Sequence, residues 1–133
     1  MVPSQPLTPL LEEELFQRGV RLFNRGEFFE CHEVLEDLWR PMRGPRRLFL
    51  QAVIHIAVGL YHHRQQNPTG AERQLRKGLK KLAGYLPEYE GVNTIALYGA
   101  GASALERIRD GGSVEPAGVR IQLRESPLPS RPS

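Results

Sequence analysis

The pattern of hydrophobic and polar positions predicts a chain of helices. Over residues 8–26, apolar side chains recur every three or four positions with charged ones between them, as in an amphipathic helix. A second helix is predicted over residues 27–40, because Pro41 disfavours helical backbone at the residue before it. Residues 45–66 are apolar around most of a helical circumference, a pattern typical of a helix in the middle of a fold.

Two more helices are expected after this central one. Residues 67–87 begin with an Asn-Pro start signal and keep a narrow leucine stripe. Residues 93–109 are rich in glycine and alanine, which allow close contact with a neighbouring helix. We therefore predict an all-α fold for a single helical domain of residues 1–110. Its architecture is a compact bundle of four main helices plus a fifth C-terminal helix, arranged as helical hairpins with the third helix central.

Residues 111–133 have the composition of a tail, since nearly half of them are Gly, Pro or Ser. Within this tail, Val119, Ile121 and Leu123 alternate with polar residues, which is the period of an extended segment with one apolar side. Two interpretations stay open. The segment is an arm that lies against the bundle or a partner, or the alternation is a coincidence in an unstructured tail.

Composition restricts the class of protein further. The 133 residues contain one cysteine, Cys31, so an intramolecular disulfide or a site with two cysteine ligands is excluded. The longest apolar run, residues 52–61, is far shorter than the about 18 residues that a membrane-spanning helix needs. The first residues lack the features of a secretory signal. We predict a soluble cytoplasmic protein with no membrane segment.

Charge is unevenly distributed along the chain, although the net charge is only +3. Residues 27–37 contain five acidic and no Lys or Arg side chains, whereas residues 73–81 contain five basic and no acidic ones. Two oppositely charged helices are therefore expected. Because exposed faces of opposite sign allow two copies to dock, we predict a homo-oligomer.

A polar cluster is predicted between the second and third helices. His32 and Glu36 lie four residues apart, on the same side of the second helix as Trp39. The third helix carries three polar side chains within a narrow sector of an otherwise apolar surface: Gln51, His55 and His62. Because buried polar groups need partners, we expect the two polar stripes to face each other.

This cluster has two interpretations. In the structural one, its members form a hydrogen-bonded network that fixes the register of the two helices. In the chemical one, His32, Glu36 and His55 bind a divalent metal, and Glu33 or Gln51 orients a water for hydrolysis. No other cofactor is predicted, and the spacing differs from the His-Glu-x-x-His motif of metallopeptidases. The leading hypothesis is a protein- or small-ligand-binding module, and a metal-dependent hydrolase is the alternative.

The basic residues of the fourth predicted helix suggest a second alternative, which is nucleic-acid binding. Their side chains are Arg73, Arg76, Lys77, Lys80 and Lys81. No aromatic residues for base stacking lie between them, and a charged face opposite a leucine stripe is common on surface helices. A nucleic-acid partner is therefore not favoured.

Three segments of the chain resemble a known family, and they cover most of residues 15–86. The segments are Phe23-Asn24-x-Gly26-x-Phe28-Phe29-Glu30-Cys31-His32-Glu33-x-x-Glu36-x-x-Trp39, Arg47-x-Phe49-x-Gln51-x-x-Ile54-x-x-Ala57 and Asn67-Pro68-x-Gly70-Ala71. They resemble the small all-helical proteins of domain-of-unknown-function family 309. The resemblance implies an α-helical bundle with His32, Glu33, Glu36, Trp39 and Gln51 at signature positions. It implies no activity, because the family has no established one.

Overall fold

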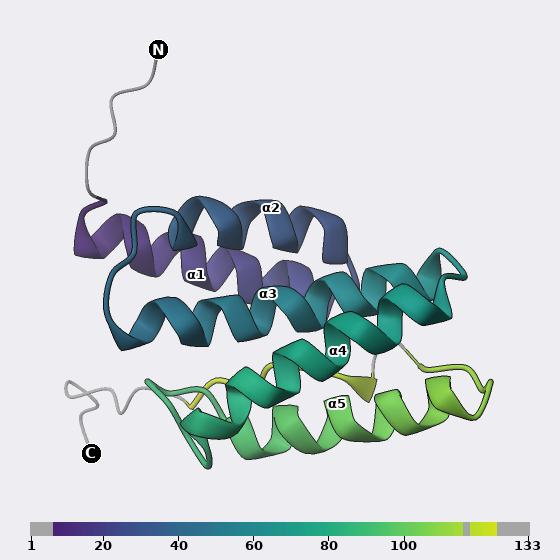
Figure 1. Cartoon of the computed structure of the whole chain (residues 1–133). Coiled ribbons are helices and arrows are strands. Elements are labelled where there is room, and N and C mark those ends of the chain that lie inside the picture. Colours follow the sequence, from purple (N-terminus) through teal and green to yellow (C-terminus); the bar gives the residue numbers. More distant parts are fainter. Residues whose placement is uncertain (1–6, 116–117, 125–133) are drawn as a thin grey trace, which may run out of the picture.

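Five α-helices and one short 3-10 turn form the part of the chain that the structure describes, residues 7–115 and 118–124. In this computed structural model the elements are α1 (Pro9–Asn24), α2 (Phe28–Trp39), α3 (Pro45–Arg64), α4 (Pro68–Leu82), the 3-10 turn η1 (Ala83–Tyr85) and α5 (Thr94–Arg109) (Figure 1). The predicted all-α fold class is confirmed. The largest difference lies in the fourth helix, which ends at Leu82 and continues as η1, short of the predicted end near residue 87.

Local capping determines where several helices begin. Thr8, Asn67 and Asn93 each precede a helix, and each side-chain oxygen accepts a hydrogen bond from the backbone N–H three residues later, at 3.0 to 3.1 Å. Proline occupies the first turn of α1, α3 and α4, where its missing N–H costs no helical hydrogen bond. These starts depend on neighbouring residues alone, which is why the sequence predicts them well.

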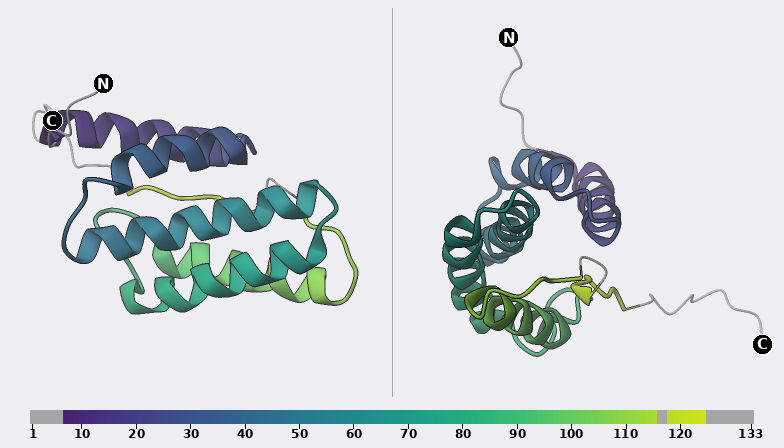
Figure 2. Two further views of the ribbon diagram at one scale, coloured as in Figure 1. Left: turned by 45° about the horizontal axis from the view of Figure 1, so that its top comes forward. Right: turned by 90° about the vertical axis from the view of Figure 1, so that its right-hand side faces the viewer.

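Each helix packs mainly against the helices next to it in sequence. α3 contacts α2 on one side and α4 on the other, as expected for the central helix, and it contributes nine buried residues. Seen end-on, the five helices follow an arc from α1 to α5, and residues 118–124 lie between the two ends of this arc (Figure 2). Among residues 7–115 and 118–124, no helix is long and apolar enough to cross a membrane.

The helices α3 and α4 approach each other closely, and glycine makes this approach possible. A Cβ atom on Gly78 of α4 would lie 2.8 Å from Ile56 Cγ1 and 2.9 Å from the backbone oxygen of Ala52. Gly59 of α3 is similarly tight, because a Cβ there would lie 2.8 Å from Leu75 Cγ. The two helices therefore touch almost backbone to backbone.

We expect Gly78→Ala to destabilise the protein by about 1–3 kcal/mol, because the added methyl meets a backbone oxygen that cannot move alone. Gly99→Ala is the matched control, since this α5 position is exposed and has open space around it. The control should stabilise the protein by about 0.5–1 kcal/mol through helix propensity. Urea denaturation monitored by circular dichroism measures both values, and equal effects of the two changes would contradict the close packing.

Candidate functional site

The residues predicted to form one polar cluster occupy three separate places. His32 and Glu36 form a pair along α2, with His32 Nε2 3.2 Å from Glu36 Oε2. The other oxygen of Glu36 lies 3.1 Å from Arg40 Nη2, so the carboxylate joins two partners on its own helix. The His32 and Glu36 side chains are 27% and 31% exposed. Such pairs on one helix are worth about 0.5 kcal/mol or less.

His55 is directed toward α4 and not toward this pair. Its Nδ1 donates a hydrogen bond to the side-chain oxygen of Gln74, at 2.7 Å. His62 lies 3.2 Å from the side chain of Asn67 at the start of α4. The structure thus does not bring His55 to His32 and Glu36. Within residues 7–115 and 118–124, no group of three His, Cys, Asp or Glu side chains is arranged to hold a metal ion.

Trp39 lies at the end of α2, apart from the other predicted site residues, and packs against Arg47 of α3. The guanidinium of Arg47 lies over its ring at 3.9 Å from the centroid. Trp39 Nε1 and Arg47 Nε are both buried, and neither has a hydrogen-bond partner in the described part of the chain. The cation–π contact offsets part of this cost and fixes the end of α2 against the start of α3. Glu33, the remaining predicted site residue, is exposed on α2.

Gln51 and His55 line an open groove of about 1070 Å³ between α3, α4 and η1. We call it the lysine groove, because three lysines of α4 line it. Its lining residues are Pro45, Leu48, Gln51, His55, Lys77, Lys80, Lys81, Gly84 and Tyr85. Leu48 leaves 45% of its surface exposed there. The groove thus combines positive charge, hydrogen-bonding groups and an apolar contact.

The charge of the lysine groove is not neutralised within the described part of the protein. Lys77, Lys80 and Lys81 take part in none of the ion pairs formed by residues 7–115 and 118–124. Burial lowers the pKa of His55 below its ordinary value of 6.5, and Lys81 and Lys77 lower it further, against the effect of the hydrogen bond to Gln74. His55 is therefore mainly neutral at pH 7, and the lysines carry the charge that attracts an anion.

From the sequence, the lysines are expected on a solvent face, and Gln51 and His55 are expected to face the second helix and not the fourth. Gly78 is a feature of the sequence that could have indicated the contact between α3 and α4. A glycine inside a helix often marks a close approach of backbones. A Cβ on Gly78 would lie 3.1 Å from the Cβ of His55, so the α4 residues around Gly78 necessarily flank that part of α3.

Comparison with known proteins agrees with the resemblance found in the sequence. Residues 16–74 match the model of the family described as Domain of unknown function (DUF309), which confirms the resemblance over that segment. An uncharacterized protein of Bacillus subtilis, YpuF, is 41% identical over 58 residues, which cover 42% of this chain and 33% of YpuF. An uncharacterized protein of Aquifex aeolicus is 24% identical over 83 residues, covering 62% of this chain and 25% of the relative.

These matches identify a shared helical segment and no activity. The chain matches only a third and a quarter of the length of these two relatives. The matched family segment contains α2 and α3 with His32, Glu36, Trp39, Gln51 and His55, and it ends at residue 74. The lysines of the groove lie beyond that end, so the family match includes one wall of the lysine groove but not the other.

The environment of His55 predicts how stability depends on pH. Because its pKa is lowered in the folded state, the unfolded chain takes up a proton more readily as pH falls below about 6.5. The free energy of unfolding should therefore decrease from pH 7.5 to pH 5.5. His55→Gln should reduce this dependence, whereas Gln51→Ala, which removes no titrating group, should retain it. Urea titrations at several pH values test this, and identical slopes in the two variants would contradict it.

Proposed function

We propose that the chain is a protein-binding module whose lysine groove receives an acidic segment of its partner. One observation carries this proposal: three lysines without an ion-pair partner among the described residues share one groove with Gln51 and His55. Unpaired charges of one sign in a concave surface attract ligands of the opposite sign and orient them on approach. Gln51 adds one side-chain amide, which can donate to a carboxylate and both donate to and accept from a peptide backbone.

The composition of the groove favours an acidic protein segment over a nucleic acid. Its cations are lysines, which act as single point charges, and arginine is absent from its lining. Tyr85 is its one aromatic residue, and the tyrosine hydroxyl is engaged with the backbone oxygen of Pro45. Stacking on successive bases is therefore not supported. Exposed Leu48 instead suits an apolar side chain next to the acidic ones.

A second copy of this chain provides an acidic helix of the required kind. Glu27 at the start of α2 and Glu30 and Glu33 within it are exposed, and they form no ion pair with other residues in 7–115 and 118–124. In a two-fold dimer, α2 of each copy would dock in the lysine groove of the other, so that the same contact forms twice. We therefore propose a homo-oligomer in which both charged surfaces are covered.

We also propose a cytoplasmic location for this oligomer. Cys31 is fully buried, and burial raises the pKa of its thiol to about 12. It therefore stays protonated at neutral pH and is suited to packing, not to disulfide exchange. A single inert thiol is typical of proteins from reducing compartments.

Charge reversal tests the self-association. In sedimentation experiments at micromolar concentration and low salt, Lys77→Glu combined with Lys81→Glu should weaken association at least tenfold, because like charges then face each other. The matched control combines Arg73→Glu with Arg107→Glu, which changes the net charge equally at exposed positions outside the groove. The control should associate nearly as the unmodified chain does.

A complementary variant makes this test specific. A chain carrying Glu30→Lys and Glu33→Lys should also associate poorly alone, but it should form a mixed oligomer with the Lys77→Glu, Lys81→Glu chain. If the unmodified chain stays monomeric, a labelled peptide of residues 27–40 and a single-stranded RNA of equal charge are titrated separately. Binding of RNA alone would replace the proposal by the nucleic-acid alternative, and binding of neither would overturn it.

A further inference from the structure

Residues 118–124 are held against the helices through their backbone. The side chain of Asn24, the last residue of α1, bonds twice to Ile121: Asn24 Oδ1 accepts from the Ile121 N–H at 2.8 Å, and Asn24 Nδ2 donates to the Ile121 oxygen at 3.0 Å. The backbone N–H of Asn93 donates to the Gln122 oxygen at 2.9 Å. The Asn24 side chain and the turn at Asn93 thus bond to backbone groups of the segment, which every residue type except proline possesses.

The side chains of this segment alternate between buried and exposed. Val119 and Ile121 are 2% and 3% exposed, whereas Arg120 and Gln122 are exposed. Leu123 is half-buried and pairs with Val92 in an isolated antiparallel bridge. This is the arrangement in which an extended peptide binds through main-chain hydrogen bonds and is selected by pockets for alternate side chains.

The bonding surface comes from both ends of the helical arc. Asn24 belongs to α1, Gly91 and Asn93 belong to the turn before α5, and Val119 lies beside Ala100 and Ala104 of α5. The end-on view of Figure 2 shows the segment between α1 and α5. The four pairs of consecutive helices pack directly on each other, so the segment is not the only link between any two neighbouring helices.

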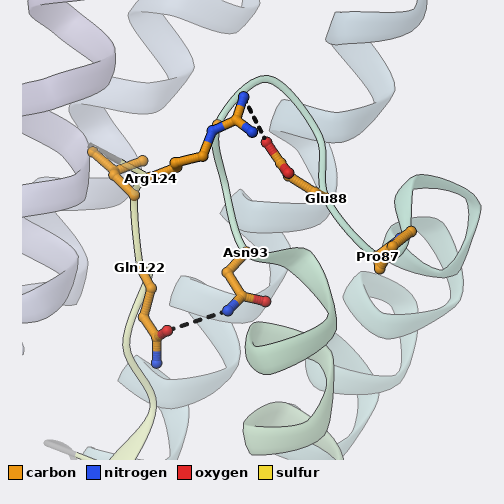
Figure 3. A pocket seen from close by; sticks show the side chains of 7 residues that line it. Pro87, Glu88, Asn93, Gln122 and Arg124 are labelled. Carbon is orange, nitrogen blue, oxygen red and sulfur yellow. Dashed lines mark hydrogen bonds and ion pairs between the residues drawn. The ribbon is translucent and has the colours of Figure 1, made fainter. Parts of the chain in front are cut away.

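Beside the end of this segment lies an open hollow of about 450 Å³, lined by Pro87, Glu88, Gly91, Asn93, Gln122, Leu123 and Arg124. In this hollow, Glu88 pairs with Arg124 at 3.2 Å and the side chain of Asn93 donates to Gln122 at 3.3 Å (Figure 3). The Arg124 N–H donates to the Gly91 oxygen at 2.6 Å. The hollow leaves room for side chains larger than those of the resident segment.

We infer that the surface formed by Asn24, Gly91, Asn93 and the facing side of α5 is a binding site for an extended peptide of a partner protein. The partner peptide carries apolar side chains at two alternate positions, like Val119 and Ile121. Residues 118–124 occupy this peptide site in cis and compete with the partner. The site shares no lining residue with the lysine groove, so it goes beyond the function proposed above.

The test uses the full chain and a labelled synthetic peptide of residues 118–124 with blocked ends. Val119→Asp combined with Ile121→Asp weakens the resident segment without changing the surface that holds it. This double variant should bind the peptide with a dissociation constant below about 0.1 mM, which is about a tenth of the effective concentration of a tethered segment. The unmodified chain should bind it at least tenfold more weakly, because a tethered competitor acts at an effective concentration in the millimolar range.

Matched controls separate recognition from non-specific adhesion. Asn24→Ala, added to the double variant, should weaken peptide binding at least fivefold, since it removes both bonds to the peptide backbone. Arg21→Ala, an exposed position on the same helix, should leave binding unchanged. A peptide with aspartate at the positions of Val119 and Ile121 should not bind.

Circular dichroism decides whether the binding result can be interpreted. If the double variant keeps its helical signal and a cooperative melt but does not bind the peptide, the segment is a fixed strap and the inference is overturned. If the double variant loses its helical signal, Ile121→Ala replaces it. This milder variant should bind the peptide more tightly than the unmodified chain does, but more weakly than a fully released site would, and such binding supports the inference. Loss of helical structure in Ile121→Ala as well would make the segment part of the core and overturn the inference.

Discussion

The contact between α3 and α4 determines most of what this protein presents to a partner. Gly59 and Gly78 remove the side chains that would otherwise hold the helices apart, and a Cβ at either position would lie within 3.2 Å of a backbone oxygen. The lysines of α4 are consequently brought beside Gln51 and His55. If the helices were separated by ordinary side chains, α4 would expose a basic face and α3 would need another neighbour for its polar residues.

The contact between α3 and α4 explains why the central helix α3 can carry a partly buried His55. An apolar helix that buries nine residues can carry a histidine only where the imidazole finds a partner, and Gln74 of α4 provides it. Burial and the nearby lysines keep that imidazole mainly neutral at pH 7, which avoids adding another cation to an already basic surface. The α2 pair of His32 and Glu36 is independent of this arrangement, because both partners lie on one helix.

Features that depend on neighbouring residues were predictable from the sequence, and so was the central place of α3, whereas the partner of each polar side chain on α3 was not. The starts at Thr8, Asn67 and Asn93 follow from side-chain capping within three residues. Helical spacing likewise predicts that His32 and Glu36 meet. Periodicity places His55 on a side of α3, but it does not state whether α2 or α4 covers that side. α4 covers that side because Gly59 and Gly78 let the backbones of α3 and α4 approach closely. The periodicity of a single helix does not show which other helix approaches it.

The two proposed surfaces differ in what they recognise, and this follows from the groups that form them. The lysine groove presents charges at the ends of flexible side chains, so it selects for net charge and tolerates variation in geometry. The peptide site presents an asparagine amide and turn backbone in fixed positions, so it selects mainly for an extended chain, and its one ion pair among the described residues joins Glu88 to Arg124 at the end of the segment. Salt should therefore weaken binding at the first surface more than at the second. No residue lines both surfaces, so a substitution in one of them leaves the contacts of the other in place.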